Sequence, residues 1–411
     1  MLQNWKKNFS VFMISQAISL LGSSLVQYAI TWHVTLTTSS GVAMTVMILC
    51  GILPTFFLAP FAGVWADRYS RKTLVMVSDG CIAACTLILA VVFLSGYQEL
   101  WLLYVASIIR ALGAAVQTPC ISAMLPDLVP EEHLSRANGI NSTVNSAITL
   151  SAPMLGAALL SLSDLAPIFF IDVITAAVAI LVVLFYLKVP KKEKAPKASG
   201  SQYFRELREG IQYILRHKYL WILFVFMAIF FFSAAPSAFL TPLQVTRNYG
   251  GDVWRLSAIE IVFSVGMLLG GLFMSAWAGL KNRVATMALG TAVMASCTLL
   301  LGVPLSFVPY LALMTLFGIA IPVFNTPAMV ILQERVDPDY MGRVFGVMTM
   351  VNSCFLPLGM LAFGPLADWI AIELLLFGTG FVILISSLLL LFCRPLMLAG
   401  RKKEAESAET E

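Results

Sequence analysis

The sequence predicts an all-α membrane protein with twelve transmembrane helices in two six-helix halves. Three observations lead to this fold class: an apolar composition, twelve long apolar runs and a one-sided distribution of basic residues. Of the 411 residues, 59% are hydrophobic and only 12% are charged. Soluble proteins carry about 25% charged residues, so this composition cannot cover a water-exposed surface.

The apolar runs are the candidate membrane helices, since a helix needs about 20 residues to cross a bilayer. The first run follows Lys6 and Lys7 and is too long and too polar for a cleavable signal peptide, so we expect it to be the first helix. The runs are 9–32, 41–66, 73–95, 100–124, 138–163, 166–187, 219–246, 256–279, 284–303, 308–332, 343–367 and 371–393.

The basic residues predict the orientation. If both termini lie in the cytoplasm, all but three of the 26 Lys and Arg residues fall in cytoplasmic loops or tails. The exceptions are Arg110, within a run, and Arg247 and Arg255, in one outer loop. Cytoplasmic loops of membrane proteins carry an excess of Lys and Arg. We therefore expect an even number of spans and two cytoplasmic termini.

We expect four segments along the chain: an N-terminal six-helix half at 1–187, a cytoplasmic linker at 188–218, a C-terminal six-helix half at 219–394 and a disordered cytoplasmic tail at 395–411. The linker starts with a basic stretch and continues into a segment, 203–215, whose apolar residues form one helical stripe. This pattern predicts an amphipathic helix on the inner membrane surface. The stripe consists of Phe204, Leu207, Ile211, Ile214 and Leu215.

The two halves repeat one another. Gln117-Thr-Pro119 corresponds to Asn325-Thr-Pro327 at an offset of 208 residues, and Pro130 corresponds to Pro338 at the same offset. Both segments include the end of one run, a loop and the next run. The repeat therefore predicts two halves of the same topology in parallel orientation.

A charged hairpin, Gly63-x-x-x-Asp67-Arg68-x-x-Arg71-Lys72, connects the second and third runs. Gly63 allows a neighbouring helix to approach closely. Asp67 can accept hydrogen bonds from nearby arginines or from a helix start. The alternative without a transport role is a basic turn that only sets the membrane topology.

This hairpin resembles the loop 2–3 signature of the major facilitator superfamily. The resemblance implies a major facilitator fold and a conformational charge relay that includes an acid at the cytoplasmic end of the fourth helix, here Asp127. Asp79 in the third run can reach the hairpin, and a structural ion pair is its expected role. The relay residues are then Gly63, Asp67, Arg68, Arg71, Lys72, Asp79 and Asp127.

Three ionisable residues within runs are candidates for proton coupling: Arg110, Asp172 and Glu260. Arg110 lies about 15 Å into its run, where an unpaired Arg costs at least ~2.5–3.5 kcal/mol. Burial of Asp172 favours its protonated form, as proton coupling requires. Structural pairing remains the alternative for Arg110 and Asp172, and Glu260 lies close enough to the outer surface to snorkel instead.

Polar residues at helical spacing suggest the walls of a substrate cavity, because polar groups in a membrane helix face protein or water. The first run carries such a face, and aromatic residues near 230–236 add a lipophilic candidate. The alternatives are hydrogen bonding between helices and filling of the core. The cavity candidates are Gln16, Ser19, Ser23, Gln27, Gln117, Asn141, Asn145, Phe232, Asn325 and Asn352.

Within the superfamily, the chain looks most similar to the twelve-helix drug:proton antiporters of the macrolide-efflux (Mef) type. Asn4-Trp5-Lys6, Leu128-Val-Pro-Glu-Glu-His-Leu134, Phe170-Ile-Asp-Val173, Gly266-Met-Leu-Leu-Gly-Gly271 and Tyr340-Met-Gly-Arg-Val-Phe345 carry this resemblance. It implies export of macrolide-like or other lipophilic compounds in exchange for protons by alternating access, in a bacterial plasma membrane. Export of a siderophore and transport of a lysophospholipid remain alternatives.

Other protein classes find little support. All seven cysteines fall in apolar runs without metal-ligand spacing to a His, and no G-x-x-x-x-G-K-[ST] motif is present. A membrane enzyme or receptor would need a metal cluster, a nucleophile–base pair or a soluble domain. We therefore expect no enzyme activity, cofactor, metal or nucleic acid. The expected partners are a lipophilic small molecule, protons and the bilayer, and we expect a monomer.

Overall fold

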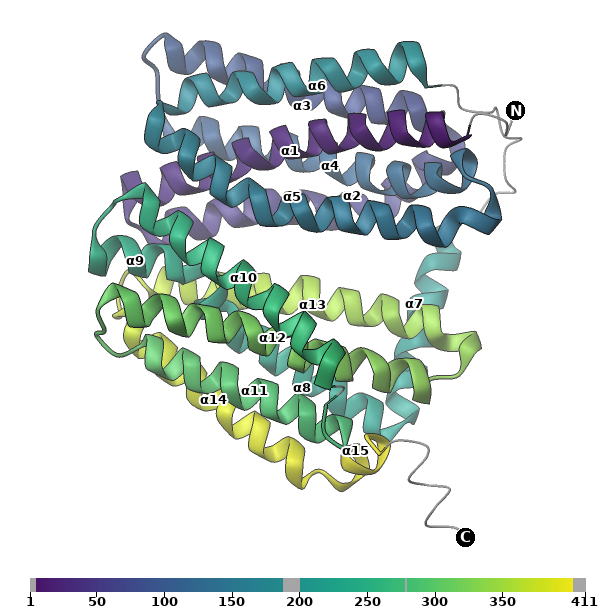
Figure 1. Ribbon diagram of the computed structural model, residues 1–411, viewed down its shortest axis with the longest axis vertical. Helices are drawn as coiled ribbons and strands as arrows, with labels where there is room; N and C mark the ends of the chain where they lie inside the picture. The colour runs from purple at the N-terminus through teal and green to yellow at the C-terminus, as the bar shows by residue number, and fades with distance from the viewer. Residues whose placement is uncertain (1–4, 188–199, 278, 402–411) are drawn as a thin grey trace. The chain divides into compact units, whose positions relative to one another are not determined.

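The computed structural model describes residues 5–187, 200–277 and 279–401, and nearly all of them are helical (Figure 1). No β-strand occurs among the described residues; an isolated bridge joins Asn282 and Arg401. Twelve helices in these ranges are long and apolar enough to cross a membrane. The predicted fold class, all-α with twelve membrane helices, is confirmed.

The helices of the first half of the chain follow the first six predicted runs and extend several of them. They are α1 (Trp5–Thr38), α2 (Gly41–Arg68), α3 (Arg71–Leu94), α4 (Leu100–Leu128), α5 (Leu134–Leu162) and α6 (Leu165–Tyr186). A short 3₁₀ turn, Glu131–His133, precedes α5. Pro119 and Pro126 lie within α4, and Pro153 lies within α5.

In the second half, the first span is divided: α8 (Lys218–Ala235) and α9 (Thr241–Tyr249) are joined by a π-helical turn, Pro236–Leu240. Single π-helical turns inside α-helices are frequent at functional sites. The other helices are α7 (Gly200–Arg216), α10 (Val253–Trp277), α11 (Arg283–Leu301), α12 (Phe307–Arg335), α13 (Pro338–Leu366), α14 (Ile372–Phe392) and the short α15 (Arg394–Ala399).

The chain forms two compact units. The first unit contains Met1–Ser39, Val46–Gly200 and Asp252–Ser257, and the second contains Ser40–Thr45, Ser201–Gly251 and Ala258–Glu411. In the first unit α1 packs against α5 and α6, and α3 packs against α4 and α6. In the second unit α8 packs against α13 and α14, and α11 packs against α12 and α14. The two units thus use the same pattern of helix pairs, as the sequence repeat predicts.

Glycines allow α10 and α12 to lie unusually close together in the second unit. A Cβ atom on Gly270 would lie 2.8 Å from the Cα atom of Ile319, and one on Gly318 would lie 3.1 Å from the Cα atom of Gly266. Backbone atoms cannot rotate away as a side chain can. Small residues are the usual means by which membrane helices approach one another.

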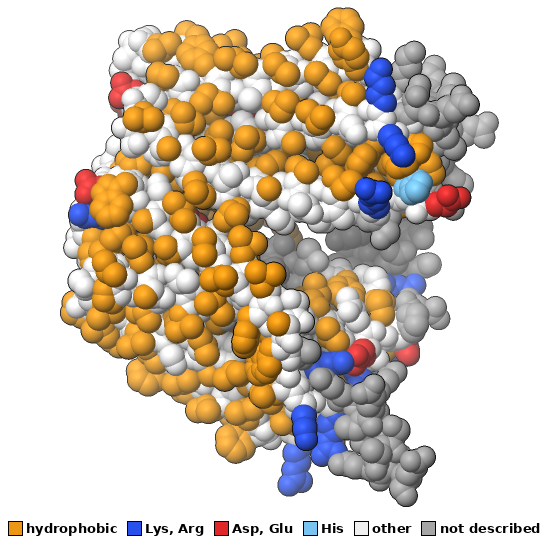
Figure 2. Space-filling view, in the orientation of Figure 1, with side chains coloured by type: hydrophobic (Ala, Val, Ile, Leu, Met, Phe, Trp, Pro, Cys, Tyr) orange, Lys and Arg blue, Asp and Glu red, His pale blue; other side chains and the backbone are white. Residues whose placement is uncertain are grey.

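Apolar side chains cover much of the visible surface along the helices (Figure 2). Phe185, Leu272 and Phe392 are among the large apolar residues that are more than half exposed. Several Lys and Arg side chains seen in Figure 2 gather at the end of the first unit's helices where α1 begins. Such a distribution is typical of helices whose sides contact lipid and whose ends reach water.

Helix α7 covers the segment predicted to form an amphipathic helix. Ile214 is buried, whereas Ile211 and Leu215 are exposed, so the predicted apolar stripe divides between the protein core and the outer surface. The side chains of Phe204 and Leu207 lie outside the described part of the structure. The position of this helix on the membrane surface stays a prediction.

The described end of α7 docks on the start of α13. The hydroxyl of Tyr213 donates to Asp337 Oδ2 at 3.1 Å, and its ring stacks on Tyr340 with the centroids 4.5 Å apart. Glu209 forms an ion pair with Arg343 at 3.3 Å. These contacts attach the linker helix to the second unit.

Candidate functional site

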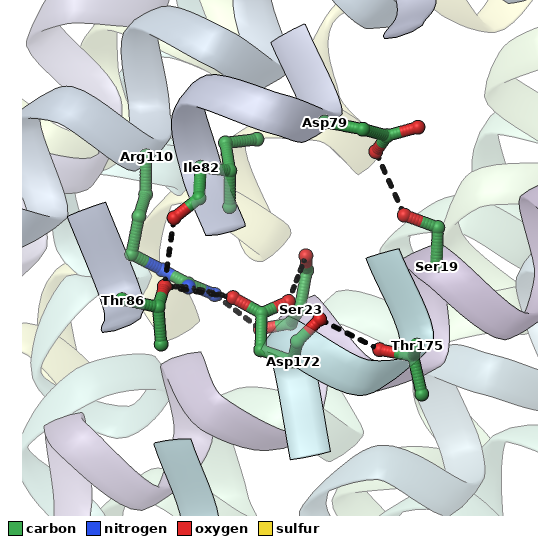
Figure 3. A network of polar contacts seen from close by, with 8 residues as sticks. All are labelled: Ser19, Ser23, Asp79, Ile82, Thr86, Arg110, Asp172 and Thr175. Atoms are coloured by element: carbon green, nitrogen blue, oxygen red, sulfur yellow. Dashed lines mark hydrogen bonds and ion pairs between the residues drawn. The ribbon is translucent and has the colours of Figure 1, made fainter. Parts of the chain in front are cut away.

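A buried network of polar side chains connects α1, α3, α4 and α6 in the first unit (Figure 3). At its centre the guanidinium of Arg110 on α4 donates to the carboxylate of Asp172 on α6. The two side chains are 5% and 0% exposed. Two of the three candidates for proton coupling therefore form one ion pair, which is the structural pairing that the sequence left open.

Both oxygens of the Asp172 carboxylate have further partners. The hydroxyl of Ser23 donates to Oδ1 at 2.7 Å, and the hydroxyl of Thr86 lies 2.8 Å from Oδ2. Arg110 also donates to the Thr86 hydroxyl at 2.6 Å and to the backbone carbonyl of Ser23 at 2.8 Å. Its Nε atom is buried without a hydrogen-bond partner in the described part of the chain.

These contacts determine how the pair affects the stability of the folded protein. Two buried charges lose several kcal/mol of hydration each, which their attraction and hydrogen bonds must offset. Removing only one of them leaves an uncompensated charge, and such changes typically cost about 3–5 kcal/mol. The pair therefore links α4 to α6, and the Asp172 carboxylate supplies the counter-charge of Arg110.

A second buried carboxylate, Asp79 on α3, has neutral partners. The hydroxyl of Ser19 donates to its Oδ1 at 2.7 Å, and the Gln117 amide donates to the same oxygen at 2.8 Å. The Gln117 amide also reaches the side-chain oxygen of Gln16 at 3.4 Å. Within the described residues Asp79 takes part in no ion pair, so the first unit buries two acids with different electrostatic environments.

The expected ion pair of Asp79 with the charged hairpin is not what the described residues show. Asp79 lies eight residues after Arg71, which places it about 12 Å along α3 from the hairpin. Its partners at that depth come from α1 and α4. Asp79 is thus held by side chains of α1 and α4, and its part in the charge relay stays a prediction.

The polar face predicted on α1 is present and mainly makes hydrogen bonds to other helices. Gln16, Ser19 and Ser23 each contact α3, α4 or α6. Gln27 is half-buried and has no side-chain hydrogen bond among the described residues. Gly22 on the same helix lies directly against the Thr175 side chain of α6, where any larger residue would collide.

The charged hairpin retains one of its predicted contacts in the described residues. Arg71 Nη1 lies 2.5 Å from Asp127 Oδ2 at the end of α4, and it donates to the Ala123 carbonyl at 2.7 Å. The side chains of Asp67 and Arg68 and the surroundings of Gly63 lie outside the described part of the structure. The Arg71–Asp127 pair connects the start of α3 to the end of α4.

Lys72, whose part in the relay stays a prediction, contacts the end of α6 in this structure. Its ammonium donates to the backbone carbonyls of Leu184 and Leu187, at 3.1 and 2.8 Å. These carbonyls lie at the C-terminal end of α6, where the last carbonyls lack helical partners. A cation at a helix C-terminus is favourable. Lys72 therefore caps α6.

Several predicted cavity residues lie apart from the network. On α5, Asn141 is half-buried and Asn145 is exposed. The Asn145 side-chain amide donates to the backbone carbonyl of Asn141, one turn away, at 2.8 Å. Asn352 on α13, in the second unit, is exposed. Nothing in the local hydropathy distinguishes these residues from the polar face of α1.

The second unit contains a pocket of about 290 Å³ that includes two predicted residues, Glu260 on α10 and Asn325 on α12. Aromatic residues dominate its wall, among them Phe230, Phe231, Phe263, Phe317 and Phe324. Glu260 lies seven residues into α10, about 10 Å from its start. It therefore lines a pocket of the second unit, whereas the sequence left snorkelling to the outer surface as the alternative.

Phe232 lies in a different place from the other aromatic residues of α8. It lines a separate apolar groove of about 760 Å³ between α8, α13 and α14. Its ring packs against Phe363 of α13 with the centroids 5.3 Å apart. The neighbouring residues Phe230 and Phe231 face the pocket that contains Glu260.

The described residues contain no group of three or more His, Cys, Asp or Glu side chains placed to hold a metal ion. The polar side chains of the first unit instead hold one another by ion pairing and hydrogen bonding. Such an arrangement can change its packing when a proton is gained or lost.

Comparisons with known proteins match this chain to membrane transporters along most of its length. A family model described as "Major Facilitator Superfamily" matches residues 12–357. Macrolide efflux protein A of Streptococcus pyogenes is 30% identical over 382 residues, covering 92% of this chain and 94% of that protein. The Staphyloferrin A transporter of Staphylococcus aureus is 22% identical over 365 residues, covering 87% and 89%. A solved bacterial homologue of the iron transporter ferroportin has the same fold, with a TM-score of 0.73 at 13% identity and coverage of 94% and 98%.

Proposed function

The chain belongs to the Major Facilitator Superfamily and is a multi-pass transporter of small molecules in a bacterial cell membrane, and on this premise we propose that it exports amphipathic drugs in exchange for protons. The substrates are macrolide-like or other lipophilic compounds, and transport proceeds by alternating access. Identity of 30% to Macrolide efflux protein A over 92% of the chain supports this substrate class.

The observation that carries the proton coupling is the buried Arg110–Asp172 pair. Protonation of Asp172 would leave Arg110 as a single buried charge, which is costly at this depth. The contacts of this pair with Ser23 and Thr86 join α1 and α3 to α4 and α6. Gain of a proton therefore favours a different packing of the first unit, which is what coupling to transport requires.

The energy of the proton gradient is sufficient for this role. One charge that crosses 100 mV releases ~2.3 kcal/mol. Each pH unit adds about 1.4 kcal/mol per proton. Arg71 and Asp127 stabilise one arrangement of the hairpin side of the first unit, which supports the proposed charge relay. The basic hairpin, linker and tail lie in the cytoplasm in this proposal, with both termini.

One alternative has its own support. The similarity to the Staphyloferrin A transporter favours export of a siderophore by the same coupling. Siderophores are polar chelators, whereas the aromatic pocket around Glu260 and the groove beside Phe232 are mainly apolar. We therefore favour lipophilic drugs over siderophores as the substrate class.

The test is drug accumulation in a bacterial strain that lacks its major efflux pumps. Expression of the protein should lower accumulation of a macrolide severalfold, and an uncoupler should restore it. A strain that expresses Gly271→Ala serves as a control with a neutral substitution and should export like the parent, because a Cβ at this position meets no atom within 4 Å. Equal accumulation with and without the protein, across macrolides and lipophilic dyes, would refute drug export. Lowered accumulation that an uncoupler does not change would refute the proton coupling.

A further inference from the structure

Glu260 is the only charged residue that lines the aromatic pocket among the described residues. The wall includes phenylalanines from α8, α10 and α12, together with Met294 and Met314. The π-helical turn between α8 and α9 contributes Ser237 and Phe239. An acid in such surroundings requires an explanation, because burial of an isolated carboxylate is unfavourable.

No partner for this carboxylate is present in the described residues. Glu260 has neither a hydrogen bond nor an ion pair there, unlike Asp172, which is neutralised by Arg110. The nearest basic residues along the chain are engaged elsewhere: Arg255 pairs with Asp252, and Arg247 pairs with Asp368. The pocket thus offers one negative charge and no positive charge.

We propose that this pocket binds the cationic group of a lipophilic substrate, with Glu260 as its counter-ion and the phenylalanine rings as its cage. Aromatic faces attract organic cations, and quaternary ammonium groups are often held in aromatic cages. The volume, about 290 Å³, is near the lower limit for drug-sized ligands, so the pocket accommodates the charged end of a larger molecule. The inference rests on the proposed function and narrows its substrate class to lipophilic amines and quaternary ammonium compounds.

Protons compete with such a cation for the same carboxylate. When the pocket is empty, Glu260 can be neutralised by a proton, and when a cation is bound, Glu260 must be ionised to pair with it. Binding should therefore weaken as the pH falls, by at most about tenfold per pH unit for one proton. Asp172 cannot act in this way, because Arg110 already supplies its counter-charge.

The experiment measures binding of radiolabelled benzyltrimethylammonium to the purified full chain in lipid nanodiscs, by equilibrium dialysis and without any gradient. This probe is permanently charged and carries an aromatic ring. Neopentylbenzene has nearly the same shape without the charge and serves as the competitor. We expect saturable binding of the cation, little displacement by neopentylbenzene and weaker binding at low pH.

Variants assign the binding to Glu260. Glu260→Gln should weaken binding at least tenfold and remove its pH dependence, whereas Glu260→Asp should retain part of both. Asp252→Asn is the matched control, since Asp252 is an exposed acid just before α10 that does not line the pocket. Phe324→Leu should weaken binding of the cation more than it changes binding of the neutral competitor. Size-exclusion chromatography verifies that each variant is folded.

The proposal is overturned if the parent protein binds no cation, if Glu260→Gln binds it as tightly as the parent, or if Asp252→Asn loses binding equally. A result in which the cation and neopentylbenzene bind alike would overturn it as well. Because the measurement needs no transport, it is separable from the proposed function. Glu260-dependent binding without drug export would support this inference and refute the export proposal. Drug export without Glu260-dependent binding would support the export proposal and refute this inference.

Discussion

The two buried acids of the first unit have nearly equal burial but unlike partners. Asp172 accepts from a guanidinium, whereas Asp79 accepts from a hydroxyl and an amide. Loss of charge has different consequences at these two positions, because only one of them would leave an opposite charge unpaired. The comparison separates the role of the charge from that of the hydrogen bonds.

We predict that Asp172→Asn destabilises the protein by about 3–5 kcal/mol, since Arg110 is left buried and unpaired. Asp79→Asn should cost at most about 1 kcal/mol, because an amide oxygen still accepts from Ser19 and Gln117. Thermal unfolding of the purified variants, followed by a thiol-reactive dye, measures the difference. The double variant Arg110→Gln/Asp172→Asn should recover part of the loss, and equal shifts for the two single variants would argue against a charge pair.

Sequence reasoning identified Arg110 and Asp172 as single residues but not as partners. An ionisable residue inside an apolar run is visible in any hydropathy profile. Which residue it pairs with depends on how α1 and α3 place α4 relative to α6, and these residues are 62 positions apart. Asp79 was assigned to the hairpin for the same reason: distance along the chain gave its depth but not the direction of its side chain.

At the scale of helices, the close approach of α10 to α12 gives a matched pair of neighbouring glycines. A Cβ on Gly270 would collide with the backbone of Ile319, whereas a Cβ on Gly271 meets nothing within 4 Å. From the sequence, Gly266-Met-Leu-Leu-Gly-Gly271 carried only part of the family resemblance, and no packing face was predicted there. Only the structure distinguishes Gly270 from Gly271.

We predict that Gly270→Ala destabilises the protein by about 1–3 kcal/mol, because the two helices must separate. Gly271→Ala should be neutral or stabilising by up to about 1 kcal/mol, since Ala favours the helix over Gly. Thermal unfolding and the yield of monodisperse protein measure both effects. A Gly271→Ala variant that loses as much stability as Gly270→Ala would contradict the packing described here.

The helices themselves were largely predictable, because bilayer thickness sets a minimum length for apolar runs. Their ends were not. Helix α1 extends from Trp5 to Thr38, well beyond its apolar run, and the seventh span contains a π-helical turn. Helix α7 lies in the predicted segment, but its contact with α13 buries Tyr213 and Ile214 and divides the expected stripe. These features depend on tertiary packing rather than on local periodicity.

At the scale of the whole molecule, the two units share a helix-packing pattern but differ in their polar residues. The first unit contains the Arg110–Asp172 pair, and the second contains an acid without a partner in the described residues, Glu260. The sequence repeat predicted the shared pattern. The difference in chemistry could not be predicted, since the pocket around Glu260 combines residues from positions 230 to 356.

The central claim is that the Arg110–Asp172 pair couples protons to export. Its most direct test is macrolide uptake into inverted membrane vesicles with an imposed pH gradient. Vesicles that contain the parent protein should accumulate the macrolide against the macrolide's concentration gradient. Asp172→Asn, at equal membrane abundance, should lose this uphill accumulation by at least tenfold while it still exchanges drug downhill. Full, pH-dependent accumulation by Asp172→Asn would contradict the account and transfer the coupling to Glu260 or Asp79.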